Sequence, residues 1–346
     1  MLEIKVERTT GSFPVFVGYH LQAKAEEILK LYNFKDKILV LTSSGFEAQY
    51  QTYLQPCLKP FQSQISLRAV DKKISLETAY EIIADLAGDG FTRQSAIISL
   101  GGIGIQSLGG FIARIFKHGI TFISIPTTLA AQLKGVVIPR VCLNVKEQFA
   151  AVSVEHFPTF AWLDVSILSR HSRAQITSGL LEAIRISIIK DARLFEFIEH
   201  NLDALYRLDP KSILYMVHKA CLIRSKILSK ATVPQENPGI LNFGEIVEFV
   251  LKTQAKHWQV SEIEAQFLGI FIETILAYRQ GFLDGKSYKR IEQLLLRLNL
   301  KVLISKINFD ELKILLDQSS DHYEQFAFPT KIGEVTLVNR KITEEK

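Results

Sequence analysis

The stretch AIISLGGIGIQSLGGF, residues 96–111, joins an apolar strand pattern to a glycine-rich turn and then to a helical pattern. This arrangement is typical of α/β proteins, in which the turn at the start of the helix often binds phosphate groups. The turn contains no Asp, Glu, Lys or Arg, so its polar groups are Gln106, Ser107 and backbone N–H groups. Close packing of strand against helix is a second explanation for its glycines, which are Gly101, Gly102, Gly109 and Gly110.

The residues around this stretch continue the same alternation. Strand patterns occur at 37–43, 63–70, 96–100 and 120–126, and helical patterns occur at 75–90 and 105–117. Ser75 is placed to cap the first of these helices, and glycines follow its end. Strands separated by helices of this length form βαβ units with a parallel sheet. We therefore predict a Rossmann-like α/β domain over residues 1–165.

The pattern changes after Asp164, where apolar residues recur at helical spacing. The helical stretches are 175–200, 211–230, 243–258, 262–281 and 288–300. A strand pair near 326–337 is the expected exception. We predict an all-α domain over residues 166–346, with any ligand in the cleft between the two domains.

The bulk composition excludes several classes of protein. The chain has 346 residues, of which 47% are hydrophobic and 22% are charged, as in ordinary globular proteins. No apolar run approaches the roughly 20 residues of a membrane span, and the N-terminus lacks a secretory signal pattern, so we expect a cytoplasmic protein. Cys57, Cys142 and Cys221 are too far apart for a disulfide framework or a metal knuckle. The net charge of +5 is dispersed, which argues against nucleic-acid binding.

Several stretches, in the same order, resemble segments of the 3-dehydroquinate synthase family. HGITFISIPTTLAAQ (118–132) resembles the family's RGI-x-FI-x-(I/V)PTTLLAQ, and residues 99–111 lie where the family has GGGVVGDLAGF. The other matching stretches are SGLLEAIRISII (178–189), GILNFGEIVEF (239–249) and FAFPTKIGEVTLV (326–338). The resemblance implies an α/β domain followed by a helical domain, with NAD and a divalent metal as cofactors. It also implies a carbon–oxygen lyase of the shikimate pathway, which closes the ring of a seven-carbon keto-acid phosphate.

The family's metal ligands, one Glu and two His, align with three glutamates. Glu182 keeps the glutamate position, whereas Glu245 and Glu262 stand where the resemblance places the histidines. A set of three carboxylates suits Mg²⁺, Mn²⁺ or Ca²⁺ better than zinc. The alternative, which we favour, is that these are helix-surface glutamates paired with Arg185 or another cation.

The family's substrate-binding positions are only partly kept. The resemblance places Arg140, Arg185 and Arg224 where the family has lysines, and it places Asn242 on a retained asparagine. Lys134 reverses the charge of a family aspartate. Residues 148–150 (Gln, Phe, Ala) replace the family's GKN. A phosphate leaving group needs converging Arg and Lys side chains, and this set differs from the family's.

The positions aligned with the family's NAD contacts have also changed. Gly101, Gly102, Thr127 and Thr128 are kept. Ile103 replaces the third glycine, Ser107 replaces an aspartate, and Ser43 stands where a carboxylate would bind the ribose. These changes argue against NAD binding, although N–H groups at a helix start can still hold an anion. We favour close packing as the reason for the glycines.

Changes at the metal, substrate and cofactor positions predict a catalytically degenerate relative, a pseudoenzyme that binds a partner or a small anionic metabolite. The alternatives are an active, divergent sugar phosphate cyclase and an ordinary 3-dehydroquinate synthase. Family members pair through their N-terminal domains. The resemblance therefore implies a homodimer or a heterodimer with an intact paralogue.

Overall fold

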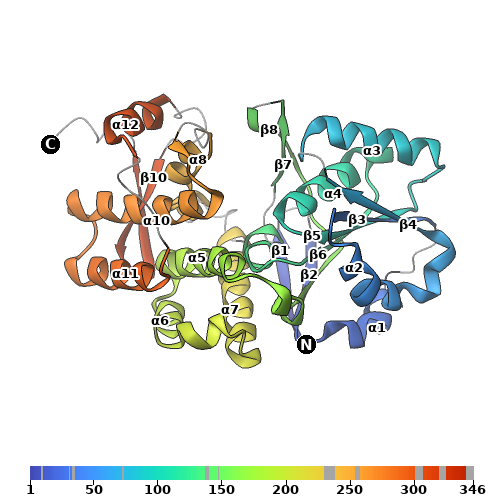
Figure 1. Ribbon diagram of the computed structural model, residues 1–346, viewed down its shortest axis with the longest axis horizontal. Helices are drawn as coiled ribbons and strands as arrows, with labels where there is room; N and C mark the ends of the chain where they lie inside the picture. The colour runs from blue at the N-terminus through green and yellow to red at the C-terminus, as the bar shows by residue number, and fades with distance from the viewer. Residues whose placement is uncertain are drawn as a thin grey trace. The chain divides into compact units, whose positions relative to one another are not determined.

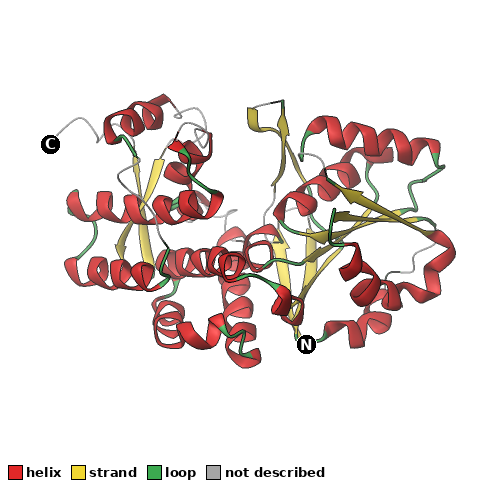
Figure 2. Ribbon diagram, in the orientation of Figure 1, coloured by secondary structure: helices red, strands yellow, loops and turns green. Residues whose placement is uncertain are grey.

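The computed structural model describes residues 1–8, 11–30, 32, 36–71, 74–136, 140–146, 148–229, 238–253, 258–300, 307–318 and 325–339. Its contacts divide the chain into two compact units (Figures 1 and 2). The first consists of Met1–Gly179 and Leu208–Ser225, and the second of Leu180–Arg207 and Lys226–Lys346. Each unit is described by itself.

A seven-stranded sheet with the order β1-β2-β9-β6-β5-β3-β4 forms the centre of the first unit. Its strands are β1 (Leu2–Arg8), β2 (Gly11–Gly18), β3 (Ile38–Ser43), β4 (Ile65–Val70), β5 (Ala96–Gly101), β6 (Thr121–Pro126) and β9 (Phe160–Asp164). Strands β1 and β2 form an antiparallel hairpin, and every other pair is parallel. All six residues of β5 are buried, as is typical of a parallel strand covered on both faces.

Helices cover both faces of this sheet. Figure 1 shows α3 and α4 on one side of the sheet and α1 and α2 on the other. The α-helices of this unit are α1 (Ala25–Lys30), α2 (Glu47–Gln49), α3 (Leu76–Gly88), α4 (Ile103–Ile115) and most of α7 (Pro210–Ser229). The other helical segments are η1 (Leu21–Lys24), η2 (Tyr50–Leu54), η3 (Gln55–Gln64), η4 (Phe116–His118), η5 (Ala131–Gly135) and η6 (Val165–Arg170). The Ser75 side chain accepts a hydrogen bond from the Thr78 N–H, so the predicted cap of α3 is confirmed.

A second antiparallel hairpin packs against α4. It consists of β7 (Arg140–Val145) and β8 (Gln148–Glu155), neither of which the hydrophobic pattern predicted as a strand. Leu143 of this hairpin is buried in the same apolar core as Leu108 and Ile112 of α4. The hairpin thus packs against α4 and contributes to the unit's core.

The carboxyl end of β9 is held by one buried side chain. The Asp164 carboxylate accepts hydrogen bonds from the backbone N–H groups of His20, Leu21 and Ser166, at 3.0, 2.6 and 2.9 Å. It also accepts from the Tyr53 hydroxyl at 2.6 Å and from the Ser166 hydroxyl at 2.7 Å. This one carboxylate therefore joins β9 to the turn after β2 and to η2.

The described residues of the second unit form helices and a hairpin. Its elements are α6 (Ala192–Tyr206), η8 (Pro238–Asn242), α8 (Glu245–Thr253), α10 (Glu262–Arg279), α11 (Gly285–Arg297), α12 (Phe309–Gln318), β10 (Gln325–Lys331) and β11 (Glu334–Asn339). It also includes most of α5 (Arg173–Lys190). The antiparallel pair β10–β11 confirms the predicted strand pair near 326–337. Within the described residues, no helix combines the length and the apolar character needed to cross a membrane.

Candidate functional site

The centre of the candidate site is Arg185, a buried arginine of α5 in the second unit. Its side chain is only 1% exposed. Its Nη2 lies 2.5 Å from both carboxylate oxygens of Glu182, one helical turn earlier. Glu182 is itself 3% exposed. The helix therefore holds a carboxylate and a guanidinium together in a place from which water is largely excluded.

Helix α8 adds two carboxylates to the same guanidinium. Arg185 Nη2 lies 3.0 Å from Glu245 Oε1, and Arg185 Nη1 lies 3.2 Å from Glu248 Oε2. Lys252, one turn further along α8, places its Nζ 2.7 Å from Glu248 Oε1. Spacings of three and four residues put these three side chains on one face of the helix. Two cations and three carboxylates therefore share the cluster.

Helix α10 completes the cluster with two buried residues. Gln266 Nε2 donates to Glu182 Oε1 at 2.9 Å. The Glu273 carboxylate accepts hydrogen bonds from the backbone N–H groups of Gly244 and Val247, at 2.7 and 3.1 Å. A Cβ atom added at Gly269 would lie 2.1 Å from the Gly244 carbonyl oxygen, so α8 and α10 require glycine at this contact. The helices that carry the charges are thus held at close range.

Two residues of this cluster, Arg185 and Glu273, have pKa values above their ordinary ones, for different reasons. Burial alone disfavours a charged Arg185, but attraction by Glu182, Glu245 and Glu248 outweighs it and raises the Arg185 pKa above its ordinary value. Burial raises the pKa of Glu273 to about 8, against the lowering effect of its two backbone hydrogen bonds. The arginine therefore stays positive, whereas Glu273 holds a proton below about pH 8.

The three glutamates aligned with the metal ligands do not all meet. Glu182 and Glu245 both contact Arg185, so the expected pairing with this arginine is confirmed. The expected surface location is wrong for Glu182, which is buried. The Glu262 side chain is 89% exposed at the start of α10, and its Oε1 lies 3.8 Å from Lys252 Nζ. Among the described residues, no group of three His, Cys, Asp or Glu is arranged to hold a metal ion.

These contacts do not fit a divalent cation beside Arg185. A metal ion needs carboxylate oxygens that face an open position. Both oxygens of Glu182 contact the Arg185 guanidinium, and the two oxygens of Glu248 contact Arg185 and Lys252. The guanidinium thus lies where the carboxylates of α5 and α8 converge.

The positions aligned with NAD contacts lie at the carboxyl edge of the first unit's sheet. Gly101 ends β5, and Gly102 precedes α4 as an N-cap that has no side chain. The Thr127 N–H donates to the Gly101 carbonyl at 3.0 Å, so the turns after β5 and β6 are joined. Thr128 Oγ1 accepts from the Ala131 N–H at 3.1 Å. The Thr127 hydroxyl is buried and has no hydrogen-bond partner within the described part of the chain.

Gln106, the largest polar side chain of the glycine-rich turn, points into the fold. Its Nε2 donates to the carbonyl oxygens of Ser99 and Gly101, at 3.0 and 3.1 Å. Its Oε1 accepts from the Ser124 hydroxyl at 2.8 Å. This amide therefore joins α4 to β5 and β6, and its hydrogen bonds stabilise the sheet edge.

Close packing explains three of the four glycines in this stretch. A Cβ atom at Gly101 would lie 2.8 Å from Ile105 Cβ, and one at Gly109 would lie 1.9 Å from Ser99 Oγ. One at Gly110 would lie 3.1 Å from Val141 Cγ1. Gly102 differs, because a Cβ atom there would make only an ordinary contact with Thr128. Of these four glycines, only Gly102 could carry a Cβ atom without a close contact.

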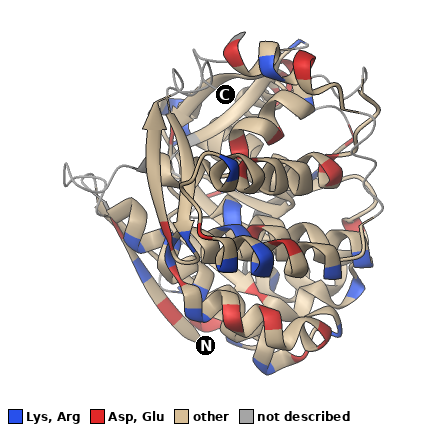
Figure 3. Cartoon of the chain, turned by 90° about the vertical axis from the view of Figure 1, so that its left-hand side faces the viewer, with Lys and Arg blue, Asp and Glu red and all other residues tan. Residues whose placement is uncertain are grey.

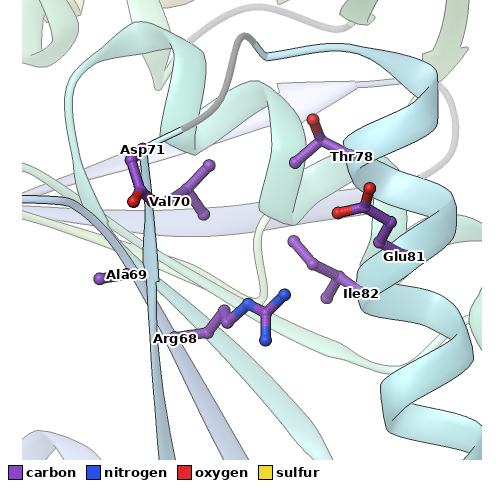
Figure 4. Close-up of a pocket in the computed structure, with 7 residues that line it drawn as sticks. All are labelled: Arg68, Ala69, Val70, Asp71, Thr78, Glu81 and Ile82. Atoms are coloured by element: carbon purple, nitrogen blue, oxygen red, sulfur yellow. The ribbon is translucent and has the colours of Figure 1, made fainter.

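A pocket lies between the carboxyl-terminal half of β4 and helix α3 (Figure 4). Its walls come from β4 with the residue that follows it and from α3: Arg68, Ala69, Val70, Asp71, Thr78, Glu81 and Ile82. Figure 4 shows the Arg68 side chain extending from β4 toward α3, where its Nη1 lies 3.2 Å from Asp85 Oδ2. The pocket therefore carries charges of both signs.

The positions aligned with substrate contacts lie in different places. Arg185 belongs to the ion cluster of the second unit, whereas Arg224 is buried beside Cys221 in the first unit. Asn242 ends η8 and is half-buried. Arg140 begins β7, and its side chain lies outside the described residues, as does that of Phe149.

Comparisons with known proteins agree with this architecture. Residues 64–178 match the family model "3-dehydroquinate synthase N-terminal", and residues 179–320 match "3-dehydroquinate synthase C-terminal". The chain belongs to the 3-dehydroquinate synthase family. The 3-dehydroquinate synthase of Thermodesulfovibrio yellowstonii is 31% identical over 264 residues, which cover 75% of this chain and 73% of that protein. The one of Thermoanaerobacter sp. is 28% identical and covers 97% of this chain and 96% of its own.

Solved structures of sugar phosphate cyclases share the fold of this 3-dehydroquinate synthase family member. ValA (2-epi-5-epi-valiolone synthase) from Streptomyces hygroscopicus subsp. jinggangensis, with NAD⁺ and Zn²⁺ bound, matches with a TM-score of 0.84 at 20% identity, over 94% of this chain and 92% of its own. A 2-deoxy-scyllo-inosose synthase complexed with carbaglucose-6-phosphate, NAD⁺ and Co²⁺ matches with a TM-score of 0.85 at 17% identity, over 99% and 98%. The predicted family and fold class are therefore confirmed.

Sequence reasoning missed four residues of the ion cluster: Glu248, Lys252, Gln266 and Glu273. A signal for two of them was present, because Glu248 and Lys252 follow Glu245 at helical spacing. Gln266 and Glu273 carried no comparable signal, since the face that α10 turns toward α8 is set by tertiary packing. The cluster thus became visible only when the three helices were placed together.

Proposed function

We propose that this member of the 3-dehydroquinate synthase family does not perform metal-dependent ring closure and acts by binding a small anionic metabolite or a protein partner. The observation that supports this proposal is the position of the Arg185 guanidinium between the carboxylates of Glu182, Glu245 and Glu248. Two of these glutamates align with metal ligands of the family. A guanidinium has no open coordination position and so cannot polarise a substrate oxygen as a Lewis acid does.

Turnover of the family's substrate tests this proposal. The purified protein is mixed with the seven-carbon keto-acid phosphate, NAD⁺ and Zn²⁺ or Co²⁺, and phosphate release is followed. We expect no release above the protein-free rate, and no rescue of a bacterial strain that lacks 3-dehydroquinate synthase. The synthase of Thermodesulfovibrio yellowstonii serves as the positive control. Phosphate release that requires both NAD⁺ and the metal would overturn the proposal.

A second candidate, an active and divergent sugar phosphate cyclase, is favoured by the sheet edge of the first unit. Gly102 leaves space at the start of α4, and the Thr127 hydroxyl is buried without a partner in the described part of the chain. Such a turn supplies N–H groups that suit a phosphate group. Two structural neighbours were solved with NAD⁺ bound. Ser43, at the end of β3, offers a hydroxyl where a dinucleotide's ribose would find a carboxylate.

Calorimetric titration with NAD⁺, with and without Zn²⁺, separates the two candidates. If the protein is a pseudoenzyme, adding Zn²⁺ should not change the heat measured on titration with NAD⁺. The cyclase candidate predicts saturable binding that Thr127→Val weakens, with Thr121→Val as a matched control at the other end of β6. If both variants bind NAD⁺ with the same heat, the NAD⁺ site lies away from Thr127.

The proposed partners are a second copy of this chain or an intact paralogue. Support comes from the family resemblance alone, since the family pairs through its N-terminal domain. Light scattering after size-exclusion chromatography measures the mass of the assembly, and mass spectrometry of an affinity-purified sample from the native cell identifies a paralogue. A monomeric mass by light scattering, together with a purified sample that contains no paralogue, would contradict this proposal.

A further inference from the structure

Strand β1 forms one edge of the seven-stranded sheet, and β2 is its only neighbour among the described strands. Its ladder with β2 runs from Leu2 to Arg8 without a bulge, and the strand contains no proline. Ile4 and Val6 are buried, so its inward-facing positions carry no charge. Proline, bulges and inward-facing charges are the features that commonly protect the N–H and C=O groups of an edge strand from pairing. The outer edge of β1 is therefore suited to pairing with another strand.

The exposed face of β1 carries three charges of alternating sign. Glu3, Lys5 and Glu7 occupy every second position and are exposed. Lys5 Nζ lies 3.3 Å from Glu7 Oε1, and the two side chains are 65% and 67% exposed. The opposite edge strand, β4, has Arg68 as its one charged residue, and this arginine pairs with Asp85 at 3.2 Å. Of the two edges, β1 thus has the charge pattern that can complement itself.

Two copies of such a strand can pair antiparallel around a two-fold axis perpendicular to the sheet. This symmetry keeps the buried faces of both sheets on the same side, and each contact then occurs twice. Residues that stand opposite each other in an antiparallel pair point to the same face, where opposite charges stabilise the pair and like charges destabilise it. The residue at the axis therefore decides which side chains meet.

A register centred on Ile4 matches opposite charges and also matches apolar side chains. Glu3 stands opposite Lys5 of the second copy, and by symmetry this pair occurs twice. Leu2, which is 42% exposed in the single chain, stands opposite Val6 of the second copy. Ile4 meets its own symmetry mate at the axis. These pairs are of the kinds that suit a sheet, and they cover an exposed leucine.

The two neighbouring registers fit less well. Centring the pair on Lys5 sets Lys5 against Lys5 and Glu3 against Glu7, so like charges meet directly. Centring it on Val6 sets Lys5 against Glu7 but leaves Leu2 outside the ladder. The charges therefore exclude the first of these registers, and the exposed leucine disfavours the second.

We propose that β1 is a self-pairing surface, through which two copies of this chain join their sheets antiparallel in the register centred on Ile4. The inference rests on the proposed function in taking a second copy of this chain as the partner. It adds the surface, the symmetry and the residues that meet. Backbone N–H and C=O groups of the outer edge supply the hydrogen bonds, and the Glu3–Lys5 pairs select the register.

Charge reversal tests both the surface and the register. Lys5→Glu sets Glu against Glu at both symmetric positions, and Glu3→Lys sets Lys against Lys. Each variant alone should dimerise with a Kd raised at least about tenfold. Mixed in equal amounts, the two variants again oppose Glu to Lys at both positions, so the mixture should recover the Kd of the parent. Light scattering over a concentration series measures Kd at low ionic strength, where salt screens exposed charges least.

A matched control and a second readout accompany these variants. Lys289→Glu makes the same charge change at an exposed site on α11 and should leave the Kd unchanged. Hydrogen exchange of the segment 2–8 reports the backbone pairing directly. Its amides should exchange more slowly above the Kd than below it, in the parent and in the mixture. At the concentration at which the parent is protected, Lys5→Glu alone should lack this protection.

Failure of this inference can be distinguished from failure of the proposed function. A dimeric parent whose Kd is raised by neither Lys5→Glu nor Glu3→Lys overturns the inference alone, because the copies would then pair through another surface. A mixture that stays monomeric where the parent is dimeric overturns the register centred on Ile4. A parent that is monomeric at its highest soluble concentration overturns both the inference and the proposed pairing of two copies. Phosphate release by the parent contradicts only the proposed lack of ring closure.

Discussion

The carboxylate of Glu273 accepts a hydrogen bond from the backbone N–H of Gly244 at 2.7 Å and thereby joins α10 to the start of α8. Gly244 has a φ of +77°, a left-handed conformation that favours glycine, and it directly precedes Glu245. The same carboxylate accepts the N–H of Val247 at 3.1 Å. Glu273 therefore sets the direction in which α8 leaves its turn, and with it the positions of Glu245 and Glu248.

Glu273 makes the stability of the protein depend on pH. Burial raises its pKa from 4.5 to about 8, so the folded protein keeps a proton that the unfolded chain releases. Between pH 4.5 and 8 the folded state therefore binds more protons than the unfolded chain. The contribution of Glu273 to the free energy of unfolding then falls as the pH rises through this range. We expect Glu273→Gln, which does not titrate, to lack this part of the decline.

Denaturant unfolding at several pH values between 4.5 and 8 measures this effect. The comparison is the slope of the free energy of unfolding against pH, since Glu273→Gln also loses about 1 kcal/mol from one mismatched hydrogen bond. The exposed Glu27 on α1 supplies the control, Glu27→Gln, whose slope should match the parent's. Equal slopes for all three proteins would contradict the prediction.

His156 gives the first unit the opposite dependence on pH. Its Nε2 has no hydrogen-bond partner among the described residues, and its ring lies 5.6 Å from that of Phe122. Burial, with a smaller effect from Arg114, lowers its pKa from 6.5 to about 4. As the pH falls from 6.5 to 4, the imidazole takes up a proton in the unfolded chain before it does so in the folded protein. The free energy of unfolding therefore decreases as the pH falls through this range.

The change His156→Phe should remove this loss and keep the aromatic contact. Thermal melting followed by circular dichroism at pH values between 4 and 6.5 is the measurement. His200→Phe is the control, because His200 is exposed on α6. A parent and a His156→Phe variant that melt with the same dependence on pH would show that burial of this ring carries no proton linkage.

Gln106 tests whether the glycine-rich turn is built for the fold or for a ligand. Gln106→Leu fills similar space but removes hydrogen bonds to Ser99, Gly101 and Ser124, which should lower the free energy of unfolding by about 2–4 kcal/mol. Ser107→Ala, one residue later and half-buried, should change it by no more than about 0.5 kcal/mol. A stable Gln106→Leu protein would mean that this amide is not a structural link.

The hydrogen bond between Tyr53 and Asp164 should make a measurable contribution to stability. A buried phenol that donates to a carboxylate is worth about 1.5–3 kcal/mol, so Tyr53→Phe should lose that amount in urea unfolding. Burial and the negative charge of Asp164 raise the pKa of Tyr53, which keeps the hydroxyl a donor. Tyr80→Phe, at an exposed site on α3, is the control. If Tyr53→Phe and Tyr80→Phe lower the free energy of unfolding equally, the hydrogen bond from Tyr53 to Asp164 makes no specific contribution.

The parallel strands β3, β4, β5 and β6 of the first unit, though not β9, were predictable because strands and helices alternate with different hydrophobic periods. The β1–β2 and β7–β8 hairpins were not, since each lies beside the regular βαβ units and has only short apolar patterns. Pro14, a residue that strand patterns disfavour, lies within β2 opposite Lys5 of β1. The local sequence pattern therefore predicts the repeating βαβ units better than it predicts the hairpins beside them.

Helical spacing, and the family resemblance that grouped Glu245 with Glu182 and Arg185, predicted part of the candidate site. Glu182 and Arg185 are three residues apart, so their pairing follows from helical geometry. The contribution of Gln266 and Glu273 depends on how α10 packs against α8, where Gly269 approaches Gly244 closely. Figure 3 shows acidic and basic residues interspersed along the ribbon, so their order along the chain did not distinguish the buried group.

The position of Arg185 has a consequence for how the protein is made. A side chain is incorporated at one copy per chain by the ribosome, so the positive charge between Glu182, Glu245 and Glu248 is supplied during translation. A metal ion must instead be acquired afterwards, from a pool whose composition varies with growth conditions. The charge that joins α5 to α8 in this protein is thus independent of metal supply, and no chelator can extract it.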